Sequence, residues 1–224
     1  MVLSALKVVY RKGIIKIATF ILAMILITTS CQNAKELLPF YNSPDFTAEW
    51  IKPSDQNFHS IHTIDTFSLQ SQRGHIITKD SLNGTIYVAN FFFTSCGSIC
   101  PKMTNNLSVL QEAFINNPQV KLVSFTVMPE KDSVDALKKY GEKHHIDPDK
   151  WFLITGNKER IYQLGRQSYF SEKRLGMQKD SSDFLHTESM LLIDKAGRIR
   201  GIYNATLSQD VVRAKSDINL LLNE

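Results

Sequence analysis

The chain has 224 residues, of which 43% are hydrophobic and 21% are charged, a balance typical of an ordinary globular protein. This length allows one sizeable domain and a leader. The formal net charge is only +4, and no basic run interleaved with aromatic residues is present, which argues against a nucleic-acid-binding protein.

The first thirty residues have the pattern of an export signal. Basic residues precede an apolar run at residues 17–27 that is short for a membrane-spanning helix. The next four residues, Thr28-Thr29-Ser30-Cys31, resemble the lipobox of bacterial lipoproteins, although Thr28 stands where leucine is usual. We expect residues 1–30 to be a signal peptide and Cys31 to be lipidated. The alternative is an uncleaved anchor with an idle thiol, and in both cases the domain is anchored at the inner membrane and faces the periplasm.

Residues 31–58 contain three prolines and few periodic apolar positions. This composition predicts an extended tether between the lipidated cysteine and the domain, with Phe46 and Trp50 packed at the domain edge. The domain itself is expected to span residues 59–224.

Within the domain, β-prone apolar segments alternate with helical ones. We predict strands at residues 61–69, 85–93, 120–127 and 151–154, helices at 101–114, about 134–140 and 158–167, a hairpin of strands 190–193 and 199–203, and a helix at 209–222. Asp132 or Ser133 is expected to cap the second helix, and Asn157 the third. This order predicts an α/β thioredoxin-like fold, with a central mixed sheet flanked by helices and a C-terminal hairpin and helix.

Cys96 and Cys100, spaced C-x-x-x-C, are the predicted centre of the chemistry. They are the only pair once Cys31 is assigned to the anchor, and a bridge across so short a loop adds little stability. Cys96 follows a core strand and Cys100 lies in the first turn of a helix, where Pro101 fits because it lacks an N–H. Free N–H groups and the helix dipole are expected to favour both thiolates. Two inert buried cysteines are the alternative.

The sequence around this pair resembles the SCO/SenC family, which comprises copper-handling proteins associated with cytochrome c oxidase assembly. The matching stretches are Val88–Met103, Val123–Asp132, Trp151–Gly156 and Phe184–Asp194. The resemblance implies a metallochaperone more than an enzyme, which delivers copper to, or reduces, the CuA site of the oxidase. Its expected partner is the CuA-bearing subunit or another copper-accepting protein.

The resemblance also implies a site in which Cys96, Cys100 and His186 bind Cu(I) or Cu(II), and in which the two cysteines form a redox dithiol that can close to a disulfide. Thiolates and imidazole suit copper, whereas structural zinc usually has a fourth protein ligand and no further cysteine remains. His186 alone would be an ordinary loop histidine, but it precedes a strand whose entering loop faces the dithiol in such a sheet. The other histidines are expected to be solvated or capping residues: His59, His62, His75, His144 and His145.

Two positions depart from the family pattern. Gly97 and Ser98 stand where the family commonly has proline and aspartate. Met128 replaces a carboxylate that usually lies near the site. Its side chain either packs in the domain, which we favour, or adds a thioether ligand to copper.

The main alternative function is a membrane-tethered thiol–disulfide oxidoreductase or peroxidase without a role in copper delivery. Typical thioredoxin-like oxidoreductases have C-x-x-C and a proline in the loop opposite it, whereas the last proline here is Pro148. Peroxiredoxins place a threonine three residues before the reactive cysteine, whereas Thr94 is two before Cys96. Both patterns favour the copper protein.

Overall fold

The computed structural model describes residues 37–171 and 187–224. The strands in these ranges are β1 (Phe40–Tyr41), β2 (Ala48–Glu49), β3 (Ser68–Ser71), β4 (Ile76–Thr78), β5 (Ile86–Phe92), β6 (Val120–Thr126), β7 (Trp151–Thr155), β8 (Ser189–Ile193) and β9 (Ile199–Asn204). The helical segments are η1 (Gln56–Ser60), α2 (Lys79–Leu82), α3 (Ile99–Ala113), α4 (Val134–Lys143), α5 (Lys158–Gln163), the π-helical turn η2 (Leu164–Ser168) and α6 (Ser208–Leu222).

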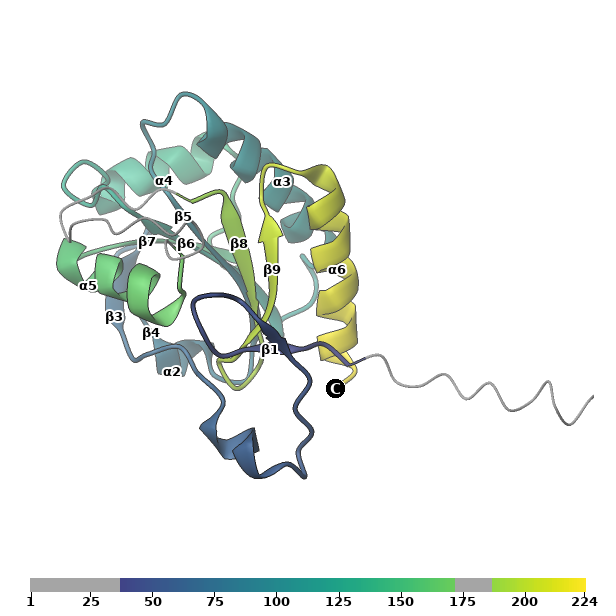
Figure 1. Ribbon diagram of the computed structural model, residues 1–224. Coiled ribbons are helices and arrows are strands. Elements are labelled where there is room, and N and C mark those ends of the chain that lie inside the picture. The colour runs from purple at the N-terminus through teal and green to yellow at the C-terminus, as the bar shows by residue number, and fades with distance from the viewer. Residues whose placement is uncertain (1–36, 172–186) are drawn as a thin grey trace, which may run out of the picture. The chain divides into compact units, whose positions relative to one another are not determined.

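Seven strands form one mixed sheet in the order β4-β3-β7-β6-β5-β8-β9, while β1 and β2 pair with each other. Strand β5 is parallel to β6 and antiparallel to β8, which continues as a hairpin into β9. Helices cover both faces of the sheet (Figure 1). The α/β thioredoxin-like fold predicted from the order of elements is confirmed.

Strand β5 is buried along its whole length, as its unbroken apolar sequence predicts. Val88 and Phe92 point into a core cluster with α3, α4 and α6. Tyr87, Ala89 and Phe91 alternate with them and point into a second cluster with α2, α5 and η2 on the other face. Both faces of the sheet therefore hold β5 in place.

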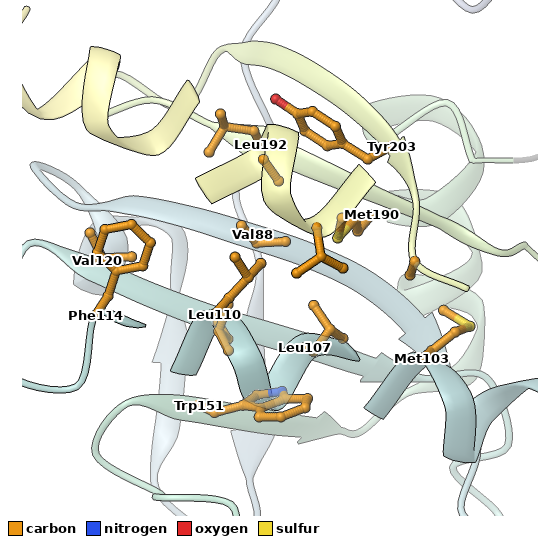
Figure 2. Packing of buried hydrophobic residues seen from close by; sticks show 14 of the residues in the cluster. Val88, Met103, Leu107, Leu110, Phe114, Val120, Trp151, Met190, Leu192 and Tyr203 are labelled. Carbon is orange, nitrogen blue, oxygen red and sulfur yellow. The ribbon is translucent and has the colours of Figure 1, made fainter. Parts of the chain in front are cut away.

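Helix α3 packs on the first of these clusters through one side. Met103, Leu107 and Leu110 recur at helical spacing and are almost fully buried. Figure 2 shows Leu107 and Leu110 between Val88 and Trp151, and Met103 farther along the same side of the helix. The start of α3 is thereby fixed relative to the end of β5. None of the helices in residues 37–171 and 187–224 is both long and apolar enough to cross a bilayer.

Two predicted elements differ from the structure. Residues 61–67 form an irregular segment in which Ile61, Ile64 and Phe67 are buried, and strand β3 begins only at Ser68. The helix predicted over 158–167 is α-helical only to Gln163 and then continues as η2. Of the two candidates for the cap of α4, Ser133 accepts the Ala136 N–H at 3.3 Å.

The segment before β3 is more closely attached to the domain than an extended tether. The Arg200 guanidinium donates hydrogen bonds to the Leu38 carbonyl at 2.8 Å and to the Pro39 carbonyl at 3.1 Å. The same guanidinium lies over the Phe40 ring. Residues from Leu37 onward accordingly belong to one compact unit with the sheet. Their apolar positions are too few and too irregular to reveal this contact.

The two aromatic residues expected at the domain edge behave differently. Phe46 makes edge-to-face contacts with Tyr41 and Phe170. Trp50, in contrast, is 68% exposed, so most of its side chain faces solvent.

Replacement of Arg200 by alanine is expected to lower the free energy of unfolding by about 3 kcal/mol, measured by urea denaturation. Arg200 is 4% exposed and binds Glu224 through two hydrogen bonds of 2.8 and 2.9 Å, so its loss leaves the carboxylate and two carbonyls unpaired. Arg73→Ala breaks an exposed ion pair with Asp149 and should cost less than about 1 kcal/mol. Equal losses in the two variants would contradict the prediction.

Candidate functional site

The dithiol lies where β5 passes into α3. Strand β5 ends at Phe92, a turn carries Cys96, and α3 begins at Ile99, so that Cys100 is in its first turn. The Cys96 N–H donates to the Phe93 carbonyl at 3.3 Å, and the Cys100 N–H donates to the Cys96 sulfur at 3.5 Å. Both cysteines are free thiols in the structure. The predicted placement at a strand end and a helix start is confirmed.

Cys96 is the more acidic of the two thiols. Partial burial disfavours a charged sulfur here, but backbone N–H groups of Cys100 and Ser98 donate to it and outweigh that effect, lowering the pKa of Cys96 from 9.0 to about 7. The exposed helix start supplies these donors because its first N–H groups have no partner within the helix. Cys96 therefore ionises much more readily than an ordinary cysteine at neutral pH, and its side chain is partly accessible to solvent.

Cys100 has the opposite character. It is 4% exposed and belongs to the core cluster beneath α3, and this burial raises its pKa to about 12. Negative charge at Cys96 and at Asp132 acts in the same direction. The expectation that the helix start favours both thiolates is therefore confirmed for Cys96 and wrong for Cys100, because the desolvation of the inner sulfur outweighs the favourable donors.

The structure adds a buried carboxylate to the surroundings of the dithiol. Asp132, which the sequence indicates only as a candidate helix cap, is fully buried and accepts hydrogen bonds from the N–H and hydroxyl of Thr94, two residues before Cys96. The Thr126 hydroxyl also donates to it. Because 38 residues separate Thr94 from Asp132, no local spacing in the sequence signals this contact.

Two predicted site residues, Cys31 and His186, lie outside the residues that the structure describes. The strand that follows His186 is described: β8 begins at Ser189 and runs antiparallel to β5, with Met190 opposite Asn90. The chain thus enters β8 at the same end of the sheet at which β5 leads to Cys96. Within residues 37–171 and 187–224, no three His, Cys, Asp or Glu side chains gather as a metal site.

Met128 packs in the domain. Its side chain is half-buried against the aromatic cluster that includes Phe91 and Phe125, whereas Cys96 and Cys100 pack with the cluster on the opposite face of the sheet. The backbone of Met128 forms a tight turn, in which its carbonyl accepts the Asp132 N–H at 2.9 Å. These contacts support the packing interpretation over a thioether ligand.

The fold and the site together define a thioredoxin-like protein, in which a dithiol at a helix start follows a central strand. The chain belongs to the SCO1/SenC family, whose model matches residues 56–219. A curated relative, the SCO1 protein homolog of Bacillus subtilis (strain 168), is 30% identical over 146 residues, which cover 64% of this chain and 74% of that protein.

Solved structures of this family share the fold. A SCO1/SenC family lipoprotein from Bacillus anthracis superposes with a TM-score of 0.64 at 27% identity, over 77% of this chain and 99% of the other. BsSco, a member of the Sco family of cytochrome c oxidase assembly proteins with a disulfide switch, gives 0.60 at 28% identity, over 70% and 92%. Arabidopsis thaliana ScoI, solved with copper bound, gives 0.56 at 25% identity, over 71% and 98%.

The unequal thiols predict a pH profile for alkylation of the reduced protein by iodoacetamide. The rate at Cys96 should rise as the pH increases and reach half its maximum near pH 7, because the thiolate is the reactive form. Cys100 should stay unmodified up to about pH 10, since burial keeps it protonated. Peptide mapping by mass spectrometry separates the sites, and equal modification of both at pH 8 would contradict the prediction.

Proposed function

We propose that this protein is a copper-handling protein of cytochrome c oxidase assembly, which delivers copper to, or reduces, the CuA site. The observation that carries the proposal is the pair of sulfurs at the start of α3, with one thiol ionising near neutral pH and the other enclosed by the core. Copper bound to Arabidopsis thaliana ScoI and the assembly role of BsSco support it.

The donor set fits copper as cargo. Thiolate sulfurs are soft ligands that favour Cu(I), and imidazole suits copper in either oxidation state. Cys96 is available as a thiolate at neutral pH, whereas Cys100 has to lose its proton when it binds the ion. Burial on one side and exposure on the other leave the ion accessible to a partner that takes it over.

His186 is the proposed third ligand. It precedes β8 by three residues, and β8 starts at the end of the sheet that carries the dithiol. An imidazole from this segment would complete a set of two sulfurs and one nitrogen. The proposal for His186 rests on this register and on the family resemblance.

Reduction of a disulfide in the partner is a second role that the acidity of Cys96 favours. Its thiolate attacks one sulfur of the partner's disulfide and releases the other as a thiol, forming a mixed disulfide. Cys100 then loses its proton and displaces the partner's remaining sulfur, closing the Cys96–Cys100 bond. Two electrons have passed to the partner, which is left with two thiols.

Copper binding can be tested with the reduced, full-length Cys31→Ser protein, in which Cys96 and Cys100 are the only cysteines. It should bind a single Cu(I) ion. Cys96→Ser or His186→Ala should each weaken this binding by more than about 100-fold, because the loss of a group that only supports the ligands costs about 10- to 100-fold in metal affinity. Competition with a chromophoric Cu(I) chelator measures both quantities. Transfer of the ion to a copper-free CuA-bearing subunit then tests delivery.

Met128→Ala is the matched control for this titration, because it removes a sulfur that packs away from the dithiol. Its copper affinity should equal that of the parent protein. Stoichiometric binding that survives the combined loss of Cys96 and His186 would refute the site. Disulfide reduction without copper affinity would favour the oxidoreductase alternative.

We also propose that residues 1–30 are removed as a signal peptide and that lipidated Cys31 holds the domain at the inner membrane, facing the periplasm. The lipobox-like sequence and the related Bacillus anthracis lipoprotein support this. Cells grown with labelled palmitate should incorporate the label into the protein, and Cys31→Ala should abolish incorporation. Unchanged labelling of the alanine variant would refute lipidation at this residue.

A further inference from the structure

The turn that carries Cys96 has few restraints of its own. Ser95, Gly97 and Ser98 are exposed, and the position of a Cβ on Gly97 has no neighbouring atom within 4 Å. Ser98 occupies the cap position of α3 without forming a side-chain capping bond. Free movement of this turn would separate the two sulfurs. Contacts with residues outside the turn are therefore needed to keep Cys96 in place.

The strongest hold on the turn comes from Asp132, which lies between β6 and α4. Its Oδ2 accepts the Thr94 N–H at 3.1 Å, and its Oδ1 accepts the Thr94 hydroxyl at 2.5 Å. Two bonds from one residue to the two oxygens of a single carboxylate fix both the position and the orientation of Thr94. Hydrogen bonds to a charged acceptor are also stronger than those between neutral groups.

The carboxylate is itself immobilised. The Thr126 hydroxyl donates to Oδ2, and the Asp132 N–H donates to the Met128 carbonyl. Asp132 is fully buried, and within the described part of the chain no cationic side chain forms an ion pair with it. A buried carboxylate satisfied by neutral donors alone is expensive to maintain, which argues for a purpose beyond stability.

We infer that Asp132 is the positioning residue of the dithiol: through Thr94 it fixes the turn that carries Cys96 and holds its sulfur within reach of Cys100. Pre-ordering the turn removes an entropic cost from every step in which the two sulfurs act together, whether they close a disulfide or share an ion. The inference rests on the proposed function only in taking the dithiol as the working site.

A redox equilibrium without copper measures this effect directly. With a chelator present, full-length Cys31→Ser protein is equilibrated with glutathione. Oxidation forms the Cys96–Cys100 bond and transfers two electrons and two protons to glutathione disulfide, which becomes two thiols. Asp132→Ala should reduce the equilibrium constant for closing the disulfide at least tenfold, since the loosened turn then has to be ordered by the new bond. This corresponds to a midpoint potential less negative by about 30 mV.

Three further variants separate positioning from charge and from general stability. Asp132→Asn keeps the shape of the side chain, an acceptor for the Thr94 N–H and a polar contact to the Thr94 hydroxyl. Its equilibrium constant for closing the disulfide should stay within threefold of that of the parent protein. Thr94→Val removes one bond from the turn and should shift the constant three- to tenfold. Thr126→Val removes a hydrogen bond that β6 donates to the same carboxylate. The equilibrium constant should then stay within twofold of that of the parent protein.

Thermal unfolding of each variant shows whether it is folded. If Asp132→Ala does not fold, the comparison of Thr94→Val with Thr126→Val decides, because both keep the carboxylate. Equal shifts in these two variants would overturn the inference, as would an unchanged constant in Asp132→Ala. A shift in Asp132→Asn as large as in Asp132→Ala would assign the effect to charge and also overturn it. Failure of copper delivery would leave these results intact.

Discussion

The burial of β5 between two hydrophobic clusters is the constraint on which the site depends. Side chains of β5 alternate between the cluster under α3 and α6 and the aromatic cluster on the other face. A strand held from both sides and paired on both edges cannot slide or tilt without disrupting the core. The point at which it ends, and hence the start of the turn with Cys96, is defined by the packing of the whole domain.

Two sulfurs placed at this point acquire different chemistry from a difference in depth. Cys96 remains near solvent, where N–H donors of the helix start stabilise its charge, while Cys100 turns into the core and is desolvated. This division suits a dithiol in which the outer thiolate reacts with a partner's disulfide and the inner sulfur then displaces the partner. It also suits a soft ion that is held firmly on one side and released on the other.

Much of this arrangement is readable in the sequence. The apolar run of β5, Pro101 in the first turn of α3, and the turn at Asp194 to Gly197 carry local signals, and the structure confirms the elements they predict. The contacts that lack such signals join distant residues. Thr94 meets Asp132 across 38 positions, and Leu38 meets Arg200 across 162. Polar residues without periodicity do not reveal which of many possible partners they contact.

The depth of Cys100 is a related case. Its place in the first turn of α3 was predictable, but the direction in which that turn faces follows from how the helix lies on the sheet. The start of a helix favours a thiolate only while solvent or polar groups surround the sulfur. Burial by neighbouring elements reverses that preference, and spacing alone contains no information about it.

The attachment of Leu38 and Pro39 to Arg200 has a consequence for how the protein meets other molecules. Arg200 lies next to Ile199, which pairs with Ile193 of β8. Ile193 in turn lies opposite the beginning of β5, whereas Cys96 follows the end of β5. The seven residues of β5 span about 20 Å. The attachment of Leu38 and Pro39 and the turn with Cys96 therefore lie toward opposite ends of β5. A second protein can bind at the dithiol without displacing the contacts that fasten Leu38 and Pro39 to the sheet.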